Sequence, residues 1–401
     1  MSDHPASRAP SVPPQAQSLN GDHLNGQLRG HPRGLLKGRA SQSNRGSRYN
    51  QLQSEAIDDG WEQAASENSD AFDSQRAMAT LVTVETPRTI INKVNSPFVA
   101  FDRSINPYRG CEHGCIYCFA RPTHAHYGLS PGLDFETKLF AKPQAAALLR
   151  RELKKARYQP RTIAIGTNTD PYQPIEKQHQ IMRQVLEVLQ EFQHPVSVLT
   201  KSAMITRDID ILGPMGQRNL AKCMMSVTTL DPKLAREMEP RASTPARRLA
   251  AIRQMTDAGL AVGVMTSPMI PGLNDHELEA LLTAAKEAGA CFAGFTIIRL
   301  PLEVSDLFRE WLEATYPDRA KRVLGHIRDM NGGKLYDPKW SRAPAPRNVY
   351  AKLLASRFQK ALRRIGLTAT HPALTTERFC PGNGGAKPSI NQLSLDLDPG
   401  K

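Results

Sequence analysis

Three cysteines in one short segment are the residues of this chain best suited to chemistry. Residues 110–118 read GCEHGCIYC, so Cys111, Cys115 and Cys118 follow the spacing C-x3-C-x2-C. Three thiolates on one loop can hold a single metal centre, and sulfur ligands favour zinc or iron–sulfur clusters. Because no fourth ligand is evident, a cluster bound here would keep one iron open to bind and reduce a ligand.

Two other interpretations of the cysteines stay open at this point. A structural zinc site is normally closed by four ligands, and His113, His124 or His126 could supply the fourth. Disulfide pairing needs an oxidising compartment, yet Met1–Gly30 contains no apolar segment of the kind found in signal peptides. We therefore expect the six cysteines to be reduced, which predicts a cytoplasmic protein.

The charge of the chain is unevenly distributed. Residues 1–80 carry eight Lys and Arg and nine Asp and Glu, a net charge of −1. Because the whole chain has a net charge of +13, residues 81–401 carry +14. A basic folded region attracts nucleic acid phosphates by counterion release, although many proteins are basic without such a partner. No apolar run of about 18 residues is present, which predicts that the chain has no membrane span.

The elements that must position the cysteines begin near residue 95. Residues 1–80 are polar and poor in aromatic and β-branched residues, which predicts a disordered tail. Beyond them, short apolar runs alternate with helical patterns. The strands are expected at 97–105, 162–165, 196–199, 221–227, 261–266 and 292–298, and the helices at 142–158, 177–192, 204–212, 245–258, 274–288, 303–315 and 349–365.

Six βα units of this length predict an α/β fold, a partial (β/α)6 barrel of the TIM type, although spacing alone does not exclude a doubly wound sheet. We expect the barrel over residues 81–316, a C-terminal helical extension over 317–380 and a flexible tail over 381–401. In such barrels the chemistry lies at the C-terminal ends of the strands. The cysteine loop directly follows the first expected strand and so falls on that side.

The cysteine spacing after the first strand of a βα repeat, with Tyr117 before the third cysteine, resembles the radical S-adenosylmethionine (SAM) superfamily. More of the chain, about residues 95–300, is similar to its spore-photoproduct-lyase-like (SplB-like) branch. The further matching segments are GTNTDPYQP at 166–174, LTKS at 199–202, SVTT at 226–229 and EPRASTP at 239–245.

The resemblance implies a cofactor pair and its contacts. Cys111, Cys115 and Cys118 would hold a 4Fe–4S cluster whose fourth iron chelates SAM, and electron transfer would cleave SAM to methionine and a 5′-deoxyadenosyl radical. The implied SAM contacts are Tyr117 near the adenine, Gly166, Thr167 and Asp170 toward the amino group, Lys201 on the carboxylate and Ser226 on polar groups. A turn role for Asp170 and a solvated strand end for Lys201 remain the structural alternatives. An electron donor such as flavodoxin or ferredoxin is implied as a partner.

The chain departs from spore photoproduct lyase at one position. That enzyme uses an additional cysteine near the second strand as its hydrogen-atom donor, and residues 158–166 contain none here. Cys223 and Cys291 lie on other strands, where small buried side chains are the simpler interpretation. Reversal of the photoproduct therefore does not carry over, which leaves the substrate open.

A short apolar segment in the C-terminal tail indicates a partner. Gln392, Leu393, Leu395 and Leu397 resemble the peptide with which bacterial DNA polymerases and repair factors enter a pocket of the sliding clamp. The alternative is a strand that folds back on the core.

Taken together, these features predict a lyase-like or modifying radical SAM enzyme that abstracts a hydrogen atom, with nucleic acid as the substrate in DNA repair or modification. A protein or small-metabolite substrate is a second hypothesis. A non-enzymatic metal protein that binds nucleic acid or the sliding clamp is a third.

Overall fold

The computed structural model describes residues 39–44, 46, 48–49, 79–95, 99, 101–338 and 348–381. Its main sheet has seven strands in the order β10-β9-β8-β7-β6-β3-β2. They are β2 (Ile91–Lys93), β3 (Arg103–Ile105), β6 (Ile163–Ile165), β7 (Val196–Thr200), β8 (Ala221–Ser226), β9 (Ala261–Met269) and β10 (Phe292–Ile297). β2 pairs antiparallel with β3, and the other neighbours pair in parallel.

The order of the parallel strands decides between the two architectures that the spacing allowed. From β3 to β10 every strand lies beside the next one in the sequence, with no reversal of the order. A doubly wound sheet reverses its order at a switch point. The partial (β/α)6 barrel is therefore confirmed.

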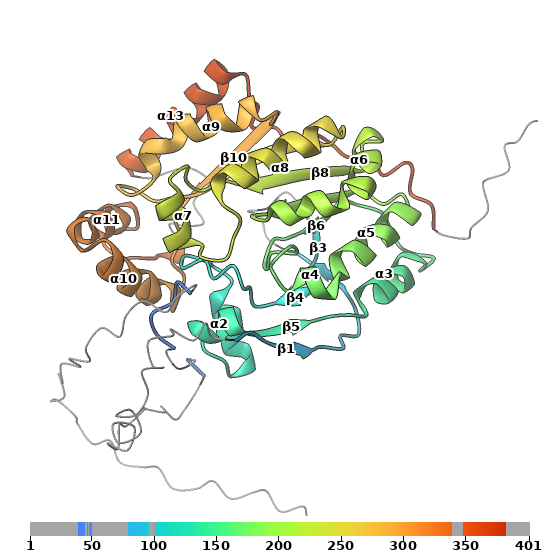
Figure 1. The fold of residues 1–401 in the computed structure, drawn as a ribbon, viewed down its shortest axis with the longest axis horizontal. Coiled ribbons are helices and arrows are strands. Elements are labelled where there is room, and N and C mark those ends of the chain that lie inside the picture. The colour runs from blue at the N-terminus through green and yellow to red at the C-terminus, as the bar shows by residue number, and fades with distance from the viewer. Residues whose placement is uncertain are drawn as a thin grey trace, which may run out of the picture. The chain divides into compact units, whose positions relative to one another are not determined.

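Helices cover the outer face of the sheet, as Figure 1 shows for α5, α6, α8 and α9. The helices of the repeat are α3 (Ala145–Leu153), α4 (Glu176–His179), α5 (Ile181–Glu191), α6 (Ile209–Gln217), α7 (Pro232–Met238), α8 (Pro245–Asp257), α9 (Leu278–Glu287) and α10 (Val304–Thr315). α5 illustrates why they form: its buried side chains Ile181, Met182, Val185, Leu186, Val188 and Leu189 recur at helical spacing. Burying each such side chain contributes about 1.5–3 kcal/mol.

Several elements were not anticipated. A second sheet joins β1 (Leu81–Val84), β5 (Lys138–Ala141) and β4 (Tyr108–Arg109), and beside it lie α2 (Leu133–Thr137) and the 3-10 helix η1 (Arg121–Tyr127). The expected helix at 177–192 is divided at Gln180, whose φ is 48°. The Glu176 carboxylate caps the new start, because it accepts the Met182 N–H at 3.1 Å.

The first expected strand is shorter than predicted: of residues 97–105, only Arg103–Ile105 form β3. The expected helices at 204–212 and 274–288 each begin with a 3-10 turn, η2 (Ala203–Asp208) and η3 (Asp275–Glu277). The helix expected at 349–365 is α13 (Val349–Ile365), and it follows α11 (Pro317–Met330) in the C-terminal extension. Among the described residues, no helix is both long and apolar enough to cross a membrane.

The tail expected over residues 1–80 is corrected at residues 39–44. Arg39, Ala40 and Ser41 are buried, and the Ser41 N–H donates to Glu136 Oε1 at 3.2 Å. Arg39 Nη1 donates to the Glu136 carbonyl oxygen at 2.8 Å. Residues 39–44 are ordered despite their low apolar content, because they donate hydrogen bonds to the buried carbonyl and carboxylate oxygens of Glu136 in α2. The clamp-like residues Gln392, Leu393, Leu395 and Leu397 lie outside the described residues.

Candidate active site

The cysteine loop lies at the C-terminal edge of the parallel strands. Cys111 and Cys115 are buried, and Cys118 is partly buried. Burial raises the pKa of the Cys111 thiol, and the nearby charges of Asp170 and Cys115 raise it further. Burial also raises the pKa of Cys115 to about 12, which Lys201 opposes. Since metal ligands bind as thiolates, occupancy of this loop must be coupled to loss of these protons.

Arg121, at the start of η1, fixes the backbone of this loop. Its fully buried guanidinium donates to the carbonyl oxygens of Gly114 and Cys115, both at 2.9 Å, and to Glu136 Oε1 at 2.5 Å. Its other nitrogen donates to the carbonyl oxygens of Pro131 and Gly132. Arg121 was not predicted from the sequence, because an arginine six residues after a cysteine forms no recognisable motif.

Gln173 also binds the cysteine loop. Its role was not predicted from the sequence, although it lies in the matching segment 166–174. Its Nε2 donates to the Gly110 carbonyl oxygen at 3.2 Å, and its Oε1 accepts the Glu112 N–H at 2.9 Å. Gln173 is fully buried in the segment after β6. The segment 166–174, which follows β6, therefore binds the cysteine loop through Gln173.

Asp170 lies at the centre of that segment. Its Oδ1 accepts Thr200 Oγ1 at 2.7 Å and the Tyr172 N–H at 2.9 Å, and its Oδ2 accepts the Lys201 N–H at 2.7 Å. His113 Nδ1 lies 3.4 Å from Oδ2. Burial alone would raise the pKa of Asp170, but His113, Thr200 and the Lys201 N–H lower it to about 2. Asp170 therefore ties β6, β7 and the cysteine loop together.

A buried polar network surrounds Tyr117. The Tyr117 hydroxyl donates to Glu239 Oε1, which also accepts Thr228 Oγ1 at 2.6 Å, and Arg248 donates to Glu239 Oε2. Burial alone would raise the pKa of Glu239, but Arg248 and Lys201 lower it to about 2. Lys201 Nζ lies 5.8 Å from the centroid of the Tyr117 ring. Glu239 and Arg248 were not singled out from the sequence, although Glu239 opens the segment EPRASTP.

Ser226 and Gly166 occupy the ends of β8 and β6. Ser226 is buried, and its carbonyl oxygen accepts Arg248 Nη1 at 3.0 Å. Gly166 has φ +90°, and a Cβ there would lie 1.9 Å from the Leu199 carbonyl oxygen, so only glycine fits. Thr167 follows it and is half-buried. The structure thus brings Tyr117, Lys201, Ser226, Gly166 and their neighbours to the strand ends beside the cysteine loop.

The residues present fit a cluster better than a zinc ion. Of the three histidines that could have completed a zinc site, His113 directs Nδ1 at Asp170, His124 places Nε2 2.9 Å from the Lys138 carbonyl oxygen, and the His126 ring packs against Tyr49. Three thiols from one loop without a fourth protein ligand match a cluster that takes each thiolate on a separate iron.

The sequence of this chain is similar to a known family and to proteins of other organisms. Residues 105–285 match the family described as the radical SAM superfamily. An uncharacterised protein of Mycobacterium tuberculosis is 34% identical over 289 residues, 71% of this chain and 81% of that protein. An uncharacterised protein of Methanocaldococcus jannaschii is 26% identical over 215 residues, 53% of this chain and 76% of that protein.

Among solved structures, a spore photoproduct lyase variant with a dinucleoside spore photoproduct superposes with a TM-score of 0.50. The superposition covers 72% of this chain and 80% of that chain at 16% sequence identity. At this identity the likeness concerns the fold.

Proposed function

Because this chain belongs to the radical SAM superfamily, we propose that it cleaves SAM reductively at a 4Fe–4S cluster held by Cys111, Cys115 and Cys118, and abstracts a hydrogen atom from a nucleic acid. It is an enzyme of that superfamily, so the alternative of a non-enzymatic metal protein is set aside. The observation that carries the proposal is the buried three-cysteine loop, whose backbone Arg121 and Gln173 hold at the strand ends.

The cluster and SAM together supply the radical chemistry, and the residues of this chain position and shield it. Arg121 and Gln173 keep the loop carbonyl groups satisfied, which fixes the directions of the three thiols. Ala40 packs in one apolar group with Cys115, Ile116 and Tyr117, so residues 39–44 help to keep water from the loop. Exclusion of water protects a reactive radical from side reactions.

Lys201 and Tyr117 are the SAM contacts that the arrangement supports most directly. Burial would lower the pKa of Lys201, but Cys115 and Glu239 raise it, so its ammonium group stays charged beside the site. A charged ammonium group suits the SAM carboxylate. Glu239 fixes the Tyr117 ring through its hydroxyl, and Lys201 Nζ lies over the same ring, so we assign both residues to one side of the SAM site. We assign Ser226, Gly166 and Thr167 to the same SAM site.

Asp170 takes a different role in this proposal. Each of its oxygens already has two partners, so we assign it to positioning the cysteine loop and the Lys201 backbone. Glu239 is engaged in the same way, since Oε1 accepts Tyr117 and Thr228 and Oε2 accepts Arg248. We therefore assign Glu239 to positioning Tyr117.

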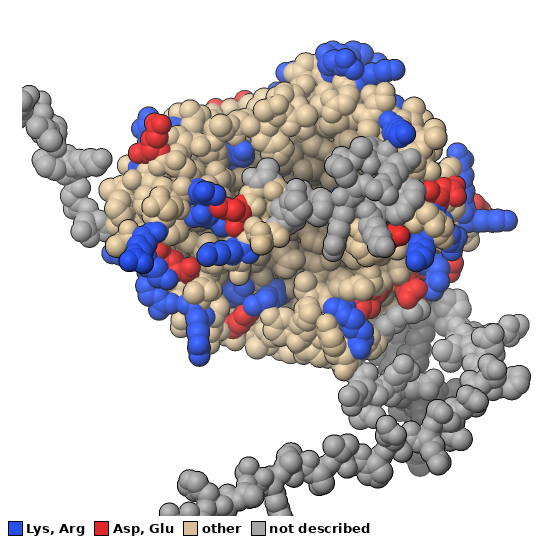
Figure 2. All heavy atoms as spheres, turned by 180° about the vertical axis from the view of Figure 1, so that it is seen from behind, with Lys and Arg blue, Asp and Glu red and all other residues tan. Residues whose placement is uncertain are grey.

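The proposal of a nucleic acid substrate rests on charge. Residues 81–401 carry a net charge of +14. On the face shown in Figure 2, Lys and Arg side chains are interspersed with Asp and Glu, so this face presents no continuous basic surface. A local basic site is therefore a better expectation than a basic face. Residues 158–166 contain no thiol, so we propose a reaction other than photoproduct reversal.

We also propose two partners and a cellular location for the enzyme. An electron donor such as flavodoxin or ferredoxin would reduce the cluster. The described cysteines are all unpaired, which suits a reducing, cytoplasm-like compartment. The sliding clamp would bind the segment at 392–397.

The decisive experiment is anaerobic reconstitution with iron and sulfide, followed by dithionite, SAM and chromatography for 5′-deoxyadenosine. We expect the parent protein to form it and the Cys115→Ala variant to fold without forming it. Cys223→Ala is the matched control, since Cys223 is buried within β8, outside the cysteine loop. A parent protein with a fully loaded cluster that forms no 5′-deoxyadenosine, with or without nucleic acid, would overturn the proposal.

A further inference from the structure

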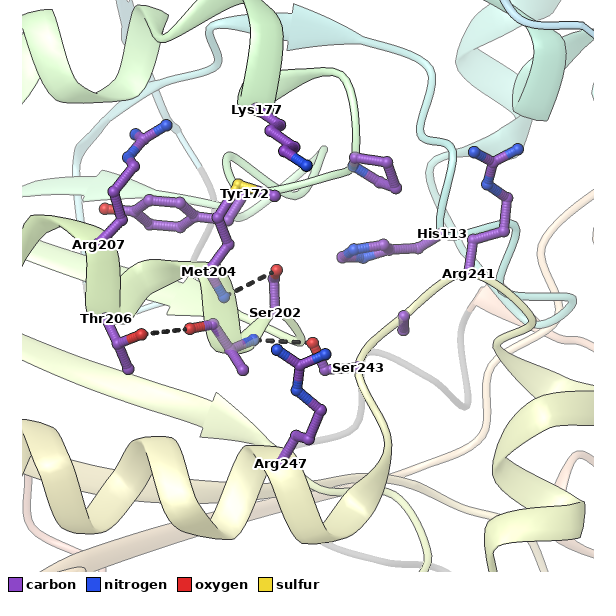
Figure 3. A pocket seen from close by; sticks show the side chains of 13 residues that line it. His113, Tyr172, Lys177, Ser202, Met204, Thr206, Arg207, Arg241, Ser243 and Arg247 are labelled. Atoms are coloured by element: carbon purple, nitrogen blue, oxygen red, sulfur yellow. Dashed lines mark hydrogen bonds between the residues drawn. The ribbon is translucent and has the colours of Figure 1, made fainter.

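A pocket of about 650 Å³ opens beside the cysteine loop and is lined by basic side chains (Figure 3). Its walls come from the segments after β6 and β7 and from the start of α8. The polar and charged lining residues are His113, Tyr172, Lys177, Ser202, Thr206, Arg207, Arg241, Ser243 and Arg247. Asp and Glu are absent from the lining among the residues that the structure describes.

Two of the four cations have no carboxylate partner among the described residues. Arg207 lies 2.7 Å from Glu176 and 2.8 Å from Asp208, and Arg241 lies 3.3 Å from Glu112. No such ion pair joins Lys177 or Arg247 within that part of the chain. Figure 3 shows Lys177 and Arg247 extending from opposite sides of the pocket, with the His113 ring between them. The pocket therefore carries positive charge that the surrounding carboxylates do not balance.

The backbone adds to this field. α8 is 13 residues long, and its first turn contains no acidic residue. A helix N-terminus carries partial positive charge and favours an anion. Here that end carries Arg247, so an anion in the pocket would face both the side chain and the helix dipole. The Ser243 hydroxyl accepts the Ala203 N–H at 2.8 Å, which leaves its proton able to donate.

His113 contributes its imidazole ring to the wall of the pocket. Its side chain is 2% exposed, and Nδ1 is directed at Asp170. Its other ring nitrogen, Nε2, has no hydrogen-bond partner among the described residues, and the ring faces the pocket. The ring therefore forms a polar part of the pocket wall, next to the cations.

The pocket is distinct from the SAM contacts assigned above. Lys201 and Ser202 directly follow the end of β7, and their side chains face different surroundings. Lys201 points toward Tyr117, whereas Ser202 lines the pocket. Tyr117, Gly166, Thr167 and Ser226 do not line it.

We propose that this pocket binds a nucleotide phosphate of the substrate and so holds one nucleotide beside the reaction cavity. The inference rests on the proposed function and names the substrate group that the enzyme grips. Lys177 and Arg247 bind the phosphate oxygens, and the Ser243 hydroxyl donates a hydrogen bond. The same chemistry fits a phosphodiester in a polynucleotide or a free nucleoside monophosphate, and the volume is large enough for a nucleotide unit.

The test compares binding by the reconstituted holoenzyme and a Lys177→Ala/Arg247→Ala double variant. The ligands are a fluorescent single-stranded oligonucleotide, followed by anisotropy across a salt series, and a nucleoside 5′-monophosphate, followed by calorimetry. We expect the double variant to bind at least about tenfold more weakly, with the salt slope reduced by about two, one for each lost phosphate contact. The Lys177→Arg/Arg247→Lys variant keeps both charges and is expected to retain most of the affinity.

The matched control is Lys155→Ala/Arg157→Ala, which removes two exposed cations after α3 at the other edge of the sheet. It is expected to bind like the parent protein. Competition by the monophosphate supports a free nucleotide as the source, and binding of the oligonucleotide alone supports a backbone phosphate. Equal losses in the double variant and the control, or no binding of either ligand, overturn the inference. 5′-Deoxyadenosine formation by the parent protein is measured separately, so failure of the radical chemistry is distinguishable from failure of the pocket.

Discussion

His113 Nδ1 lies 3.4 Å from Asp170 Oδ2, with the two side chains only 2% and 9% exposed. The contact joins the cysteine loop to the segment after β6, while the other Asp170 hydrogen bonds reach the end of β7. One carboxylate thereby connects the cysteine loop with two strands that are distant from it in sequence. These contacts indicate that Asp170 positions the cysteine loop.

Asp170→Asn is expected to lower the cluster content of the reconstituted protein. An amide has one acceptor oxygen, so its NH2 group would face donors that the carboxylate now accepts, either Thr200 and Tyr172 or Lys201 and His113. Iron and sulfide analysis, with the 400-nm absorbance, measures the effect. A variant that keeps a full cluster but loses SAM affinity would instead support direct contact with SAM.

Arg121→Met is expected to destabilise the protein and to prevent stable cluster loading. The substitution removes the guanidinium donors from four carbonyl groups and from the Glu136 carboxylate, which keeps the Ser41 N–H. Removing one partner of a buried ion pair costs about 3–5 kcal/mol. Urea unfolding and iron analysis measure the two effects. Arg253→Met, at an exposed position of α8, is the control, and equal losses in both variants would contradict a specific role for Arg121.

Lys201→Met is expected to weaken SAM binding by roughly 10–100-fold, because a hydrogen bond to a charged group contributes about 1.5–3 kcal/mol. Calorimetry with SAM on the reconstituted protein measures the change. Lys222→Met is the matched control: Lys222 lies on the neighbouring strand β8, and its Nζ donates to the Pro372 carbonyl oxygen at 2.7 Å. Unchanged SAM affinity in Lys201→Met would remove Lys201 from the site.

Gly166→Ala is expected to cost at least about 2 kcal/mol of folding free energy, because the new Cβ meets the Leu199 carbonyl oxygen at 1.9 Å and φ is +90°. Gly325→Ala is the control. No atom lies within 4 Å of a Cβ at Gly325, which is in the interior of α11, so this variant should be slightly more stable. Equal stabilities in urea would contradict the tight approach of β6 to β7.

The stability of the protein is expected to fall between pH 6.5 and about 4 through His194. Burial lowers the pKa of His194 to about 4, and its Nε2 lies 2.8 Å from the Tyr158 hydroxyl. In this window the unfolded chain binds the proton that the folded chain excludes, so stability rises with pH by at most on the order of 3 kcal/mol. His194→Gln should flatten the pH dependence of urea unfolding, whereas His276→Gln, at an exposed position, should leave it unchanged. A His194→Gln profile as steep as that of the parent protein would contradict this assignment.

The sequence by itself determined the cysteine motif and the order of the elements. The motif is local, since Cys111, Cys115 and Cys118 lie within eight residues, and spacing alone indicates one metal centre. The strands were also readable because parallel strands buried on both faces are continuous apolar runs. The apolar runs placed Lys201 and Ser226 at strand ends, and the family resemblance predicted that they contact SAM.

Only the tertiary structure decided what holds these residues in place. Arg121, Gln173, Glu239 and Arg248 act through buried hydrogen bonds to partners on other segments, and nothing in their local sequence indicates those partners. Residues 39–44 look like part of a polar tail, yet they are ordered because α2 offers them buried acceptors. Local patterns report which side chains are apolar and how they repeat, whereas the pairing of buried polar groups depends on which segments the fold brings together.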